Sequence, residues 1–441
     1  MIASPWPLTA DRDADTGAVL IGGVSAADLA DQHGTPLWVV DEHDLRARAR
    51  AYRDAFLGAT ICYASKAWCT VGLLQIAAEE GLWIDVATGG ELHTAKVAGV
   101  PLQTVVFHGN NKSLDELRMA AQLGVGRVVV DSFDELERLQ VVGDELDHTF
   151  PVWLRITPGI DAHTHEYVRT GHDDSKFGFT LSLGLADQAL LRAQATDHVD
   201  LVGIHAHIGS QIFGTDPFVA NAEVMVELLA RWRQEHGVTL GELNLGGGMG
   251  IRYTHEDHPV EVVRYGEAVL SAVAAACGRH DLPAPHVFIE PGRAIVAPST
   301  VTLYRVGTIK HLPGLRTYLS VDGGMSDNIR PALYQAEHEV GLANREGSGE
   351  LEAFTIVGKH CESGDLVRER AALPADVRVG DVIAVAATGA YTESMASNYN
   401  RVPRPAAVIV RDGQVRPLIR RETYDDLVAR DVPLGPPVTG R

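Results

Sequence analysis

The sequence of 441 residues predicts an α/β protein, a (β/α)8 barrel of the TIM type with a second, mostly β, barrel-like domain. Two observations predict this fold. Between residues 41 and 298, eight short apolar segments alternate with amphipathic ones, and eight parallel strands close such a barrel. After Pro298 the segments become short, β-branched and punctuated by Gly and Pro, as in all-β structure. A doubly wound open sheet remains an alternative, because a sequence does not show whether a sheet closes into a barrel.

Each candidate strand of the barrel is a short apolar run. The predicted strands are Ala59–Tyr63, Trp83–Val86, Thr104–Phe107, Arg127–Val130, Val152–Thr157, Val202–His207, Glu242–Leu245 and Val287–Glu290. The stretches between them repeat their apolar residues at helical spacing. Predicted helices are Val71–Glu80, Gly90–Ala98, Ser113–Gln122 and Asp134–Val141.

The second domain is predicted from the C-terminal part and the first forty residues, since Leu37–Val40 has the same β character. Its predicted strands are Val301–Ile309, Thr317–Val321, Phe354–Val357, Val382–Ala387 and Ala407–Val410. The predicted domains are therefore residues 41–298 for the barrel, and residues 1–40 with 299–441 for the β-rich domain. A chain of this length is expected to form two domains.

The charge of the chain excludes one class of partner. There are 38 basic and 58 acidic side chains, a formal net charge of −20. Such a surface repels phosphodiester backbones, so we expect no nucleic-acid partner. Any anionic ligand must be held by local arginines or backbone N–H groups.

The remaining composition predicts a soluble, cytoplasmic protein. The four cysteines, Cys62, Cys69, Cys277 and Cys361, show no C-x-x-C spacing, which argues against a disulfide framework or a zinc site. Met1–Ala10 lacks the pattern of a secretory signal, and no apolar run has membrane-spanning length. We expect neither a membrane association nor a metal.

Unusual residues follow the predicted barrel strands, where the active site of such a barrel lies. Lys66 comes directly after the first strand among small residues. A lysine in a partly desolvated pocket has a lowered pKa and becomes a nucleophile that forms an imine with an aldehyde. Taken alone, a solvated lysine at a strand end is the commoner case.

Three further motifs follow other strands. The glycine run Gly246–Gly248 lets backbone N–H groups converge on an anion, although a simple turn has the same pattern. In Glu290–Arg293, a carboxylate against a pyridine nitrogen keeps that ring protonated, and the arginine suits a phosphate or carboxylate. A plain salt bridge is the competing interpretation.

The third motif contains His205 and His207, which alternate on one strand. That spacing would suit a metal, but no carboxylate or cysteine ligand is evident nearby in the sequence. An imidazole stacked on an aromatic cofactor fits His207 better, and a packed core histidine is the plainer alternative. Ser210 could donate to a phosphate.

Together these motifs resemble those of the alanine-racemase-fold decarboxylases, and specifically the diaminopimelate decarboxylases of the actinobacterial type. The resemblance covers nearly the whole chain. It depends on Tyr63–Lys66, His108–Lys112, Lys176–Gly178, His207–Ser210, Gly246–Gly248, Glu290–Arg293, Asp322–Met325, Arg330–Tyr334, Cys361–Asp365 and Gly389–Tyr391.

The resemblance implies a carboxy-lyase that uses pyridoxal 5′-phosphate (PLP), with Lys66 as its Schiff-base lysine. His207 would stack on the cofactor ring, Asp85 would lie near it, and Glu290 would pair with its nitrogen. The phosphate would be held or approached by Ser210, Gly248, Gly292, Arg293 and Tyr391. Family members are homodimers with shared active sites, which implies that Cys361, the expected proton donor, and Glu362 enter from the partner chain.

The expected substrate is meso-2,6-diaminopimelate, which would give L-lysine and CO2 in the last step of lysine biosynthesis. Its far end carries an extra carboxylate, for which Arg330 and Arg293 offer planar cations. Tyr334 and Tyr391 add hydroxyl groups, and Glu362 suits the distal ammonium.

Other activities stay open. A decarboxylase for a carboxylated polyamine or a secondary-metabolite precursor would share almost every motif. A racemase normally sets an arginine against the ring nitrogen, so Glu290 disfavours it. A silent PLP-binding regulator is disfavoured by intact Lys66, Cys361 and Glu362.

Overall fold

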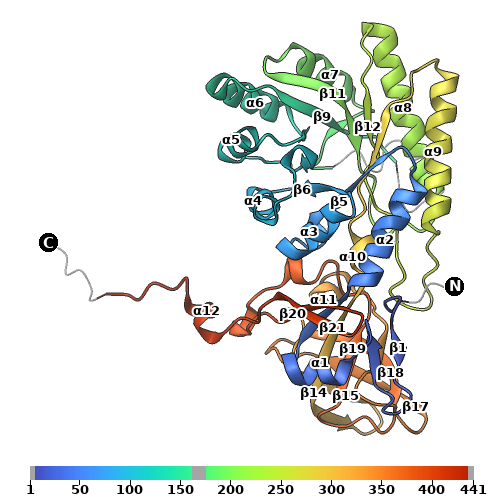
Figure 1. The fold of residues 1–441 in the computed structure, drawn as a ribbon, viewed down its shortest axis with the longest axis vertical. Helices are drawn as coiled ribbons and strands as arrows, with labels where there is room; N and C mark the ends of the chain where they lie inside the picture. Colours follow the sequence, from blue (N-terminus) through green and yellow to red (C-terminus); the bar gives the residue numbers. More distant parts are fainter. Residues whose placement is uncertain (1–4, 161–174, 436–441) are drawn as a thin grey trace. The chain divides into compact units, whose positions relative to one another are not determined.

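The computed structural model describes residues 5–160 and 175–435. Residues 1–4, 161–174 and 436–441, which belong to the predicted domains, lie outside this description. The chain divides into two compact units (Figure 1). One unit contains His43–Ser299, and the other combines Trp6–Glu42 with Thr300–Arg441.

The first unit contains a closed barrel of eight parallel strands, as the sequence predicts. Each strand pairs with the next in chain order, and the last pairs with the first. The strands are β5 (Thr60–Ala64), β6 (Trp83–Val86), β7 (Val105–Phe107), β8 (Arg127–Val130), β9 (Phe150–Thr157), β11 (Val199–Ala206), β12 (Glu242–Asn244) and β13 (His286–Ile289). The short β10 (Phe179–Thr180) pairs with the end of β9. Closure rules out the open sheet.

Helices lie on the outside of the barrel (Figure 1). They are α2 (Glu42–Ala55), α3 (Val71–Glu79), α4 (Gly89–Ala98), α5 (Leu114–Leu123), α6 (Phe133–Leu146), α7 (Leu185–Ala195), α8 (Asp216–His236) and α9 (Val262–Arg279). The short α10 (Arg293–Val296) follows β13 at the mouth of the barrel. Helices α3 to α6 begin where a Ser or Thr side chain accepts a hydrogen bond from a backbone N–H of the first turn. These caps satisfy donors that have no partner within the helix, so they fix where each helix starts. The capping residues are Thr70, Thr88, Ser113 and Ser132.

The second unit is mostly β structure and includes the N-terminal strand, as predicted. Strand β4 (Leu37–Asp41) lies between β14 (Thr300–Leu312) and β20 (Ala406–Arg411) in one sheet. The other strands of the unit are β1 (Asp11–Arg12), β2 (Val19–Ile21), β3 (Val24–Ser25), β15 (Arg316–Val321), β16 (Val340–Leu342), β17 (Leu351–Val357), β18 (Leu366–Pro374), β19 (Val382–Val385) and β21 (Gln414–Ile419). Its helices are α1 (Ala26–His33), α11 (Arg330–Tyr334) and α12 (Tyr424–Val428).

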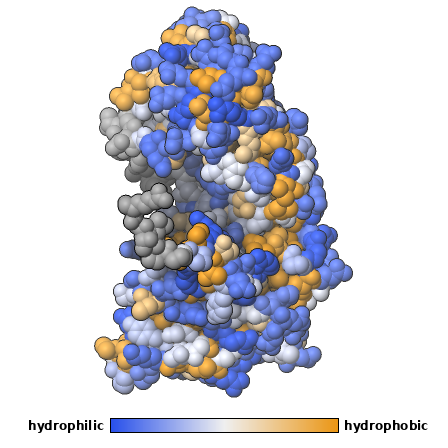
Figure 2. Space-filling view, turned by 90° about the vertical axis from the view of Figure 1, so that its left-hand side faces the viewer, coloured by the Kyte–Doolittle hydropathy of each residue, from blue (hydrophilic) through white to orange (hydrophobic). Residues whose placement is uncertain are grey.

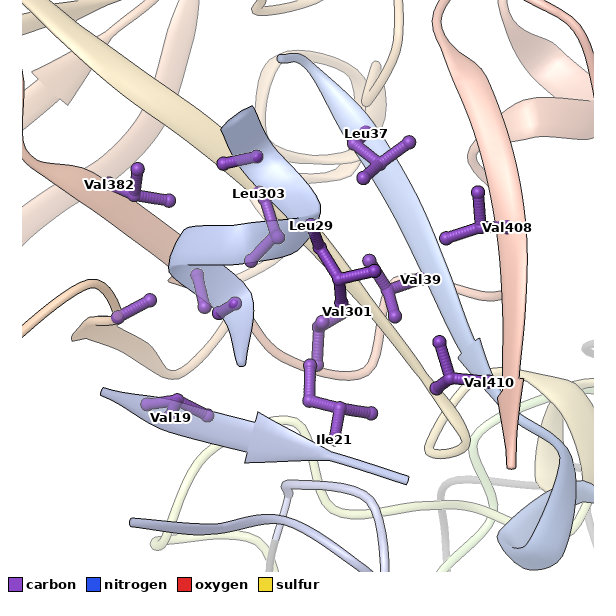
Figure 3. Packing of buried hydrophobic residues seen from close by; sticks show 14 of the residues in the cluster. Val19, Ile21, Leu29, Leu37, Val39, Val301, Leu303, Val382, Val408 and Val410 are labelled. Atoms are coloured by element: carbon purple, nitrogen blue, oxygen red, sulfur yellow. The ribbon is translucent and has the colours of Figure 1, made fainter. Parts of the chain in front are cut away.

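Part of the core of this unit joins residues from both ends of the chain. Figure 3 shows Leu29, Leu37 and Val39 packed with Val301 and Val408. All five side chains are essentially excluded from solvent. Burial of apolar surface of this extent is what holds the N-terminal segment in the β unit.

The surface drawn in Figure 2 is mostly hydrophilic, with hydrophobic residues interspersed. No helix in the described part of the chain is long and apolar enough to cross a membrane. The four cysteines are free, and Cys361 is exposed.

Candidate active site

The lysine singled out in the sequence follows β5 at the C-terminal end of the barrel. Lys66 lies in a one-turn 3-10 helix, Ser65–Ala67, and its side chain is exposed while Ser65 and Ala67 are buried. This loop is fastened to the end of the last strand, since Ala64 N–H donates to the Pro291 carbonyl oxygen at 3.1 Å. Gly292 packs so closely on it that a Cβ there would lie 2.9 Å from the Ala64 carbonyl oxygen. The glycine therefore allows this close approach to the lysine loop.

Glu290 follows β13 and is buried among three side chains from other strands and loops. Its Oε1 accepts a hydrogen bond from Asn244 Nδ2 at 2.6 Å and lies 2.9 Å from His108 Nε2. Its Oε2 lies 3.1 Å from His205 Nε2. A carboxylate has about four acceptor positions. Among the described residues, Oε2 contacts only His205, which leaves an acceptor position open on Oε2.

The neighbours of Glu290 decide its charge. Burial opposes ionisation, but the two histidines outweigh it and hold the pKa of Glu290 well below its usual range. Burial lowers the pKa of His205 to about 4, so this ring is neutral and donates from Nε2. Burial also disfavours protonated His108, but Asp85 and Glu290 raise its pKa overall. Glu290 is therefore an anion with a free acceptor position.

Asp85 is the next-to-last residue of β6 and lies on the other side of His108. Its Oδ1 lies 3.7 Å from His108 Nε2. Burial, with a smaller contribution from Glu290, raises the pKa of Asp85 to about 7, although His108 and Lys66 oppose the shift. His108 thus lies between two buried acids.

His207 follows β11 and is half-buried. Burial, then the charges of Lys66 and Arg155, lower its pKa well below the usual value, which keeps the ring neutral. Gly247 N–H donates to Nδ1 at 3.4 Å, so the proton of the ring is on Nε2. A neutral, planar ring close to Lys66 suits stacking on a cofactor.

The glycine run after β12 has no room for side chains. A Cβ on Gly247 would collide with the Glu290 carbonyl oxygen, and one on Gly248 with the Gly209 carbonyl oxygen. Gly248 also has φ of +122°, which other residues rarely adopt. Among the described residues, the N–H groups of Gly248 and Gly292 have no hydrogen-bond partner. These donors suit an anion.

Arg293 begins α10 and brings a cation to the same mouth. Its Nη2 donates to Ser210 Oγ at 2.9 Å, and its Nη1 to the Tyr253 hydroxyl at 2.5 Å. The structure therefore brings Ser210 and Arg293 together, 83 positions apart in the chain. Tyr253 was not predicted, because a lone tyrosine in a loop gives no signal.

The remaining predicted residues belong to the β unit. Arg330 is buried, at 6 % exposure. It begins α11, and its guanidinium lies 6.0 Å from the ring centre of exposed Tyr334, one turn later. Cys361 and Glu362 are exposed on the loop between β17 and β18, and Tyr391 is half-buried.

The structure corrects one expectation from the sequence. No carboxylate is evident near His205 along the chain, yet Glu290 lies beside it in space. His108, His205 and Glu290 have ligand atoms within 4.8 Å of one another, a set of the kind that binds metals. The sequence does not reveal this cluster, because its members are far apart along the chain.

His108, His205 and Asn244 are the residues that sequence reasoning missed as neighbours of Glu290. A signal exists for two of them. His108 begins the motif His108–Lys112, and Asn244 directly precedes the glycine run. For His205 the sequence suggests only a metal ligand or a core residue.

The described residues fit PLP. The cofactor has an aldehyde, a ring nitrogen and a phosphate. The barrel mouth offers Lys66 for the first, the open acceptor position of Glu290 for the second, and the N–H groups of Gly248 and Gly292 for the third.

Comparison with known proteins agrees with this fit. Residues 42–297 match the family described as pyridoxal-dependent decarboxylase, pyridoxal binding domain. The chain is 48 % identical over 426 residues to a diaminopimelate decarboxylase of Bacillus subtilis, covering 96 % of this chain and 97 % of that protein. It is 44 % identical over 436 residues to one of Mycobacterium tuberculosis, covering 97 % of each.

Solved structures agree as well. A diaminopimelate decarboxylase from M. jannaschii in complex with L-lysine superposes with a TM-score of 0.91 at 33 % identity, covering 97 % of this chain and 98 % of that one. A lysine/ornithine decarboxylase from Vibrio vulnificus, at 22 % identity and a TM-score of 0.73, shares the fold. From the barrel mouth and these relatives together, the chain belongs to the pyridoxal-dependent decarboxylases, in the diaminopimelate decarboxylase family.

Proposed function

We propose that the protein decarboxylates meso-2,6-diaminopimelate to L-lysine and CO2, the last step of lysine biosynthesis. The observation that carries the proposal is Glu290, a buried anion with one free acceptor position at the barrel mouth that also holds Lys66. The substrate is inferred from the relatives, which are named diaminopimelate decarboxylases.

In this proposal the barrel residues bind and orient the cofactor. Lys66 would hold it covalently through Nζ. When bound, PLP supplies a ring that withdraws the electron pair left by the departing carboxylate. Glu290 would keep a proton on the ring nitrogen, which would maintain that capacity, while neutral His207 would cover one ring face and Asp85 would lie near the ring.

The phosphate would be held by Ser210, Gly248, Gly292 and Arg293, with Tyr391 near it. The backbone N–H groups and the guanidinium provide the local positive potential that a chain of net charge −20 requires. The hydrogen bond from Arg293 to Ser210 keeps the guanidinium in place.

The β-rich domain would recognise the substrate. Arg330 would bind the distal carboxylate with help from Arg293, Tyr334 and Tyr391 would contribute hydroxyl groups, and Glu362 would bind the distal ammonium. Cys361 would donate the proton to Cα after CO2 leaves. We further propose a homodimer in which Cys361 and Glu362 enter from the partner chain.

Four broader points belong to the same proposal. Residues 41–298 would act as the PLP-binding domain, and residues 1–40 with 299–441 as the β-rich domain. The protein would be cytoplasmic. The actinobacterial subtype also stays a prediction, since relatives from Bacillus and Mycobacterium are of similar identity.

The test is an assay of CO2 and L-lysine from meso-diaminopimelate. Wild type should form both and show the visible absorption band of the imine at Lys66. Lys66→Ala should lose the band and the activity. Carbon dioxide release by Lys66→Ala at the wild-type rate would overturn the proposal.

Arg330→Ala tests the substrate. It should weaken diaminopimelate binding far more than PLP binding. Equal loss of diaminopimelate and PLP binding would point to another amino acid as the substrate. So would wild-type protein that turns over a substrate without the distal carboxylate better than diaminopimelate.

A further inference from the structure

The loop between β17 and β18 has an exposed tip on a buried base. Residues 361–364 at its tip are all exposed. On either side, His360 and Asp365 are buried, at 8 % and 3 % exposure. The tip carries Cys361 and Glu362, so the base determines where these two side chains point. The inference below rests on the proposed function, in which Cys361 is the proton donor.

The carboxylate of Asp365 ties the base together. Its Oδ2 accepts hydrogen bonds from the His360 backbone N–H at 2.8 Å and from His360 Nδ1 at 2.7 Å. Its Oδ1 accepts one from Met325 N–H at 2.7 Å. Because a carboxylate only accepts, the His360 proton is on Nδ1. Among the described residues, buried His360 Nε2 has no partner, so the polar contact of the ring is the one to Asp365.

Two glycines make room for this carboxylate. A Cβ on Gly324 or on Gly358 would collide with the Asp365 carboxylate oxygens. Gly324 also has φ of +146°, which disfavours any side chain. Gly358 N–H in turn donates to the Asp365 carbonyl oxygen at 3.0 Å. The space therefore fits the charged side chain of Asp365 closely.

A second segment, Tyr399–Arg401, contacts both His360 and Cys361. Its Asn400 accepts a hydrogen bond from Cys361 N–H at Oδ1, at 2.9 Å. Its Tyr399 ring stacks on His360, with ring centres 5.7 Å apart and planes 17° apart. Adjacent residues of one segment thus fix adjacent residues of the other, and the Cys361 amide cannot turn independently.

We propose that His360, Asp365 and Asn400 are positioning residues for Cys361. They fix the backbone on both sides of the thiol, while Cys361 itself stays exposed. Proton transfer depends steeply on the placement of the donor, and a displacement of about 1 Å costs on the order of 100-fold in rate.

Asn400→Ala is the first test, because Asn400 is exposed and its loss removes one acceptor without opening a cavity. Asn400 has φ of +51°, which Ala adopts less readily, so the unfolding temperature should fall slightly. The variant should retain the imine band, while kcat for L-lysine formation falls about tenfold. Lys359→Ala is the matched control. Lys359 is exposed in the same loop, and kcat should change less than about twofold.

A double-mutant cycle with Cys361→Ala separates positioning from general damage. If Asn400 acts through the thiol, Asn400→Ala should lower the residual rate of Cys361→Ala less than about twofold. A purely structural role would lower both backgrounds by the same factor.

His360 offers a rescue test. Asn places an amide N–H where His360 Nδ1 lies, whereas Leu does not. His360→Asn should therefore retain several times the kcat of His360→Leu, with equal PLP content. If His360→Leu fails to fold, Asn400→Ala and its cycle still decide the question.

Three results are decisive. Wild-type protein that releases no CO2 from meso-diaminopimelate would overturn the proposed function and, with it, the role of Cys361. Active wild type with Asn400→Ala within twofold of it would overturn the positioning proposal alone. The positioning proposal would also fail if Asn400→Ala lowered kcat by the same factor in the Cys361→Ala background as in wild type.

Discussion

Glu290 shows how far the chemistry of one residue depends on its neighbours. Buried alone, its carboxylate would favour the neutral form. His108 and His205 reverse this and keep the pKa well below the usual range. Asn244 fixes Oε1, so the open acceptor position is on Oε2. The charge and the direction of this acceptor are both set by residues from other strands and loops.

Replacing Glu290 with Gln should therefore impair chemistry more than binding. Gln has the same shape but no charge, so it cannot keep a proton on the ring nitrogen. We expect kcat to fall on the order of 100-fold or more, a loss typical of removing one electrostatic contact. The imine band should persist and report retained cofactor. Unchanged kcat with full PLP content would contradict the assigned role.

Asp327 gives a pH-dependent prediction for the β unit. Burial raises the pKa of Asp327 from 3.8 to about 7. The native state then binds a proton that the unfolded chain releases, so this contribution is fully present below about pH 4 and lost as pH rises towards 7. The unfolding free energy should fall over this range, by at most about 1.4 kcal/mol per pH unit.

Asp327→Asn should flatten this slope, since Asn keeps the acceptor for Gly324 N–H. Urea unfolding at pH 5 and pH 8 measures it. Asp425→Asn, at an exposed carboxylate, is the control and should leave the slope as in wild type. An equal slope in wild type and Asp327→Asn would show that Asp327 titrates normally.

At the residue scale the sequence predicted types of chemistry better than contacts. Lys66, Glu290 and the glycine run stand out because their positions after strands imply one barrel mouth. His108 stands out in the sequence only as part of a motif, because its contact to Glu290 spans 182 positions, from 108 to 290. Such contacts depend on strand register, which composition and periodicity do not give.

At the scale of elements, a buried ion pair joins the loop before α5 to helix α6. Lys112 Nζ donates to Glu135 Oε1 at 2.6 Å and to the carbonyl oxygens of Gly109 and Val129. Glu135 Oε2 accepts from Asp131 N–H at 2.9 Å. All three protons of the ammonium are used, and the loop after β7 is held down.

Lys112→Met should destabilise the protein strongly. It leaves Glu135 buried without a counter-charge, which costs about 3 to 5 kcal/mol. Adding Glu135→Gln should recover part of this loss. The exposed pair of Arg264 and Glu267, 3.2 Å apart, is the control, and Arg264→Ala should change stability by less than about 1 kcal/mol. Urea unfolding measures the stability of both variants. An equal loss of stability in Lys112→Met and Arg264→Ala would contradict the larger contribution assigned to the buried pair.

The barrel elements were predictable because strands and helices alternate in composition. Strand β18 was missed because its sequence, Leu366–Pro374, mixes charged residues with apolar ones and has no apolar run longer than three residues. One of its faces is exposed. Helix α11 was also missed, since a single turn has no periodicity to detect.

At the scale of the whole molecule, the proposed dimer makes a quantitative prediction. Lys66→Ala and Cys361→Ala should each be inactive or nearly so. If the two residues of a site come from different chains, mixing and reassociating equal amounts should restore about a quarter of wild-type activity, since half of the dimers gain one intact site. Sites built from one chain would give no recovery. Sedimentation should show a dimer throughout.

The place of β4 in its sheet has a consequence during synthesis. All five residues of β4 are buried, yet its neighbours begin at Thr300 and Ala406. The ribosome must therefore add about 260 residues after β4 before the first neighbour exists, which takes on the order of 10 to 50 s at ordinary translation rates. Through that interval an apolar strand with both edges unpaired is open to other nascent chains. We expect chaperones that bind nascent chains to contact the segment around Leu37–Asp41, and truncated chains that end before Thr300 to aggregate unless that segment is removed.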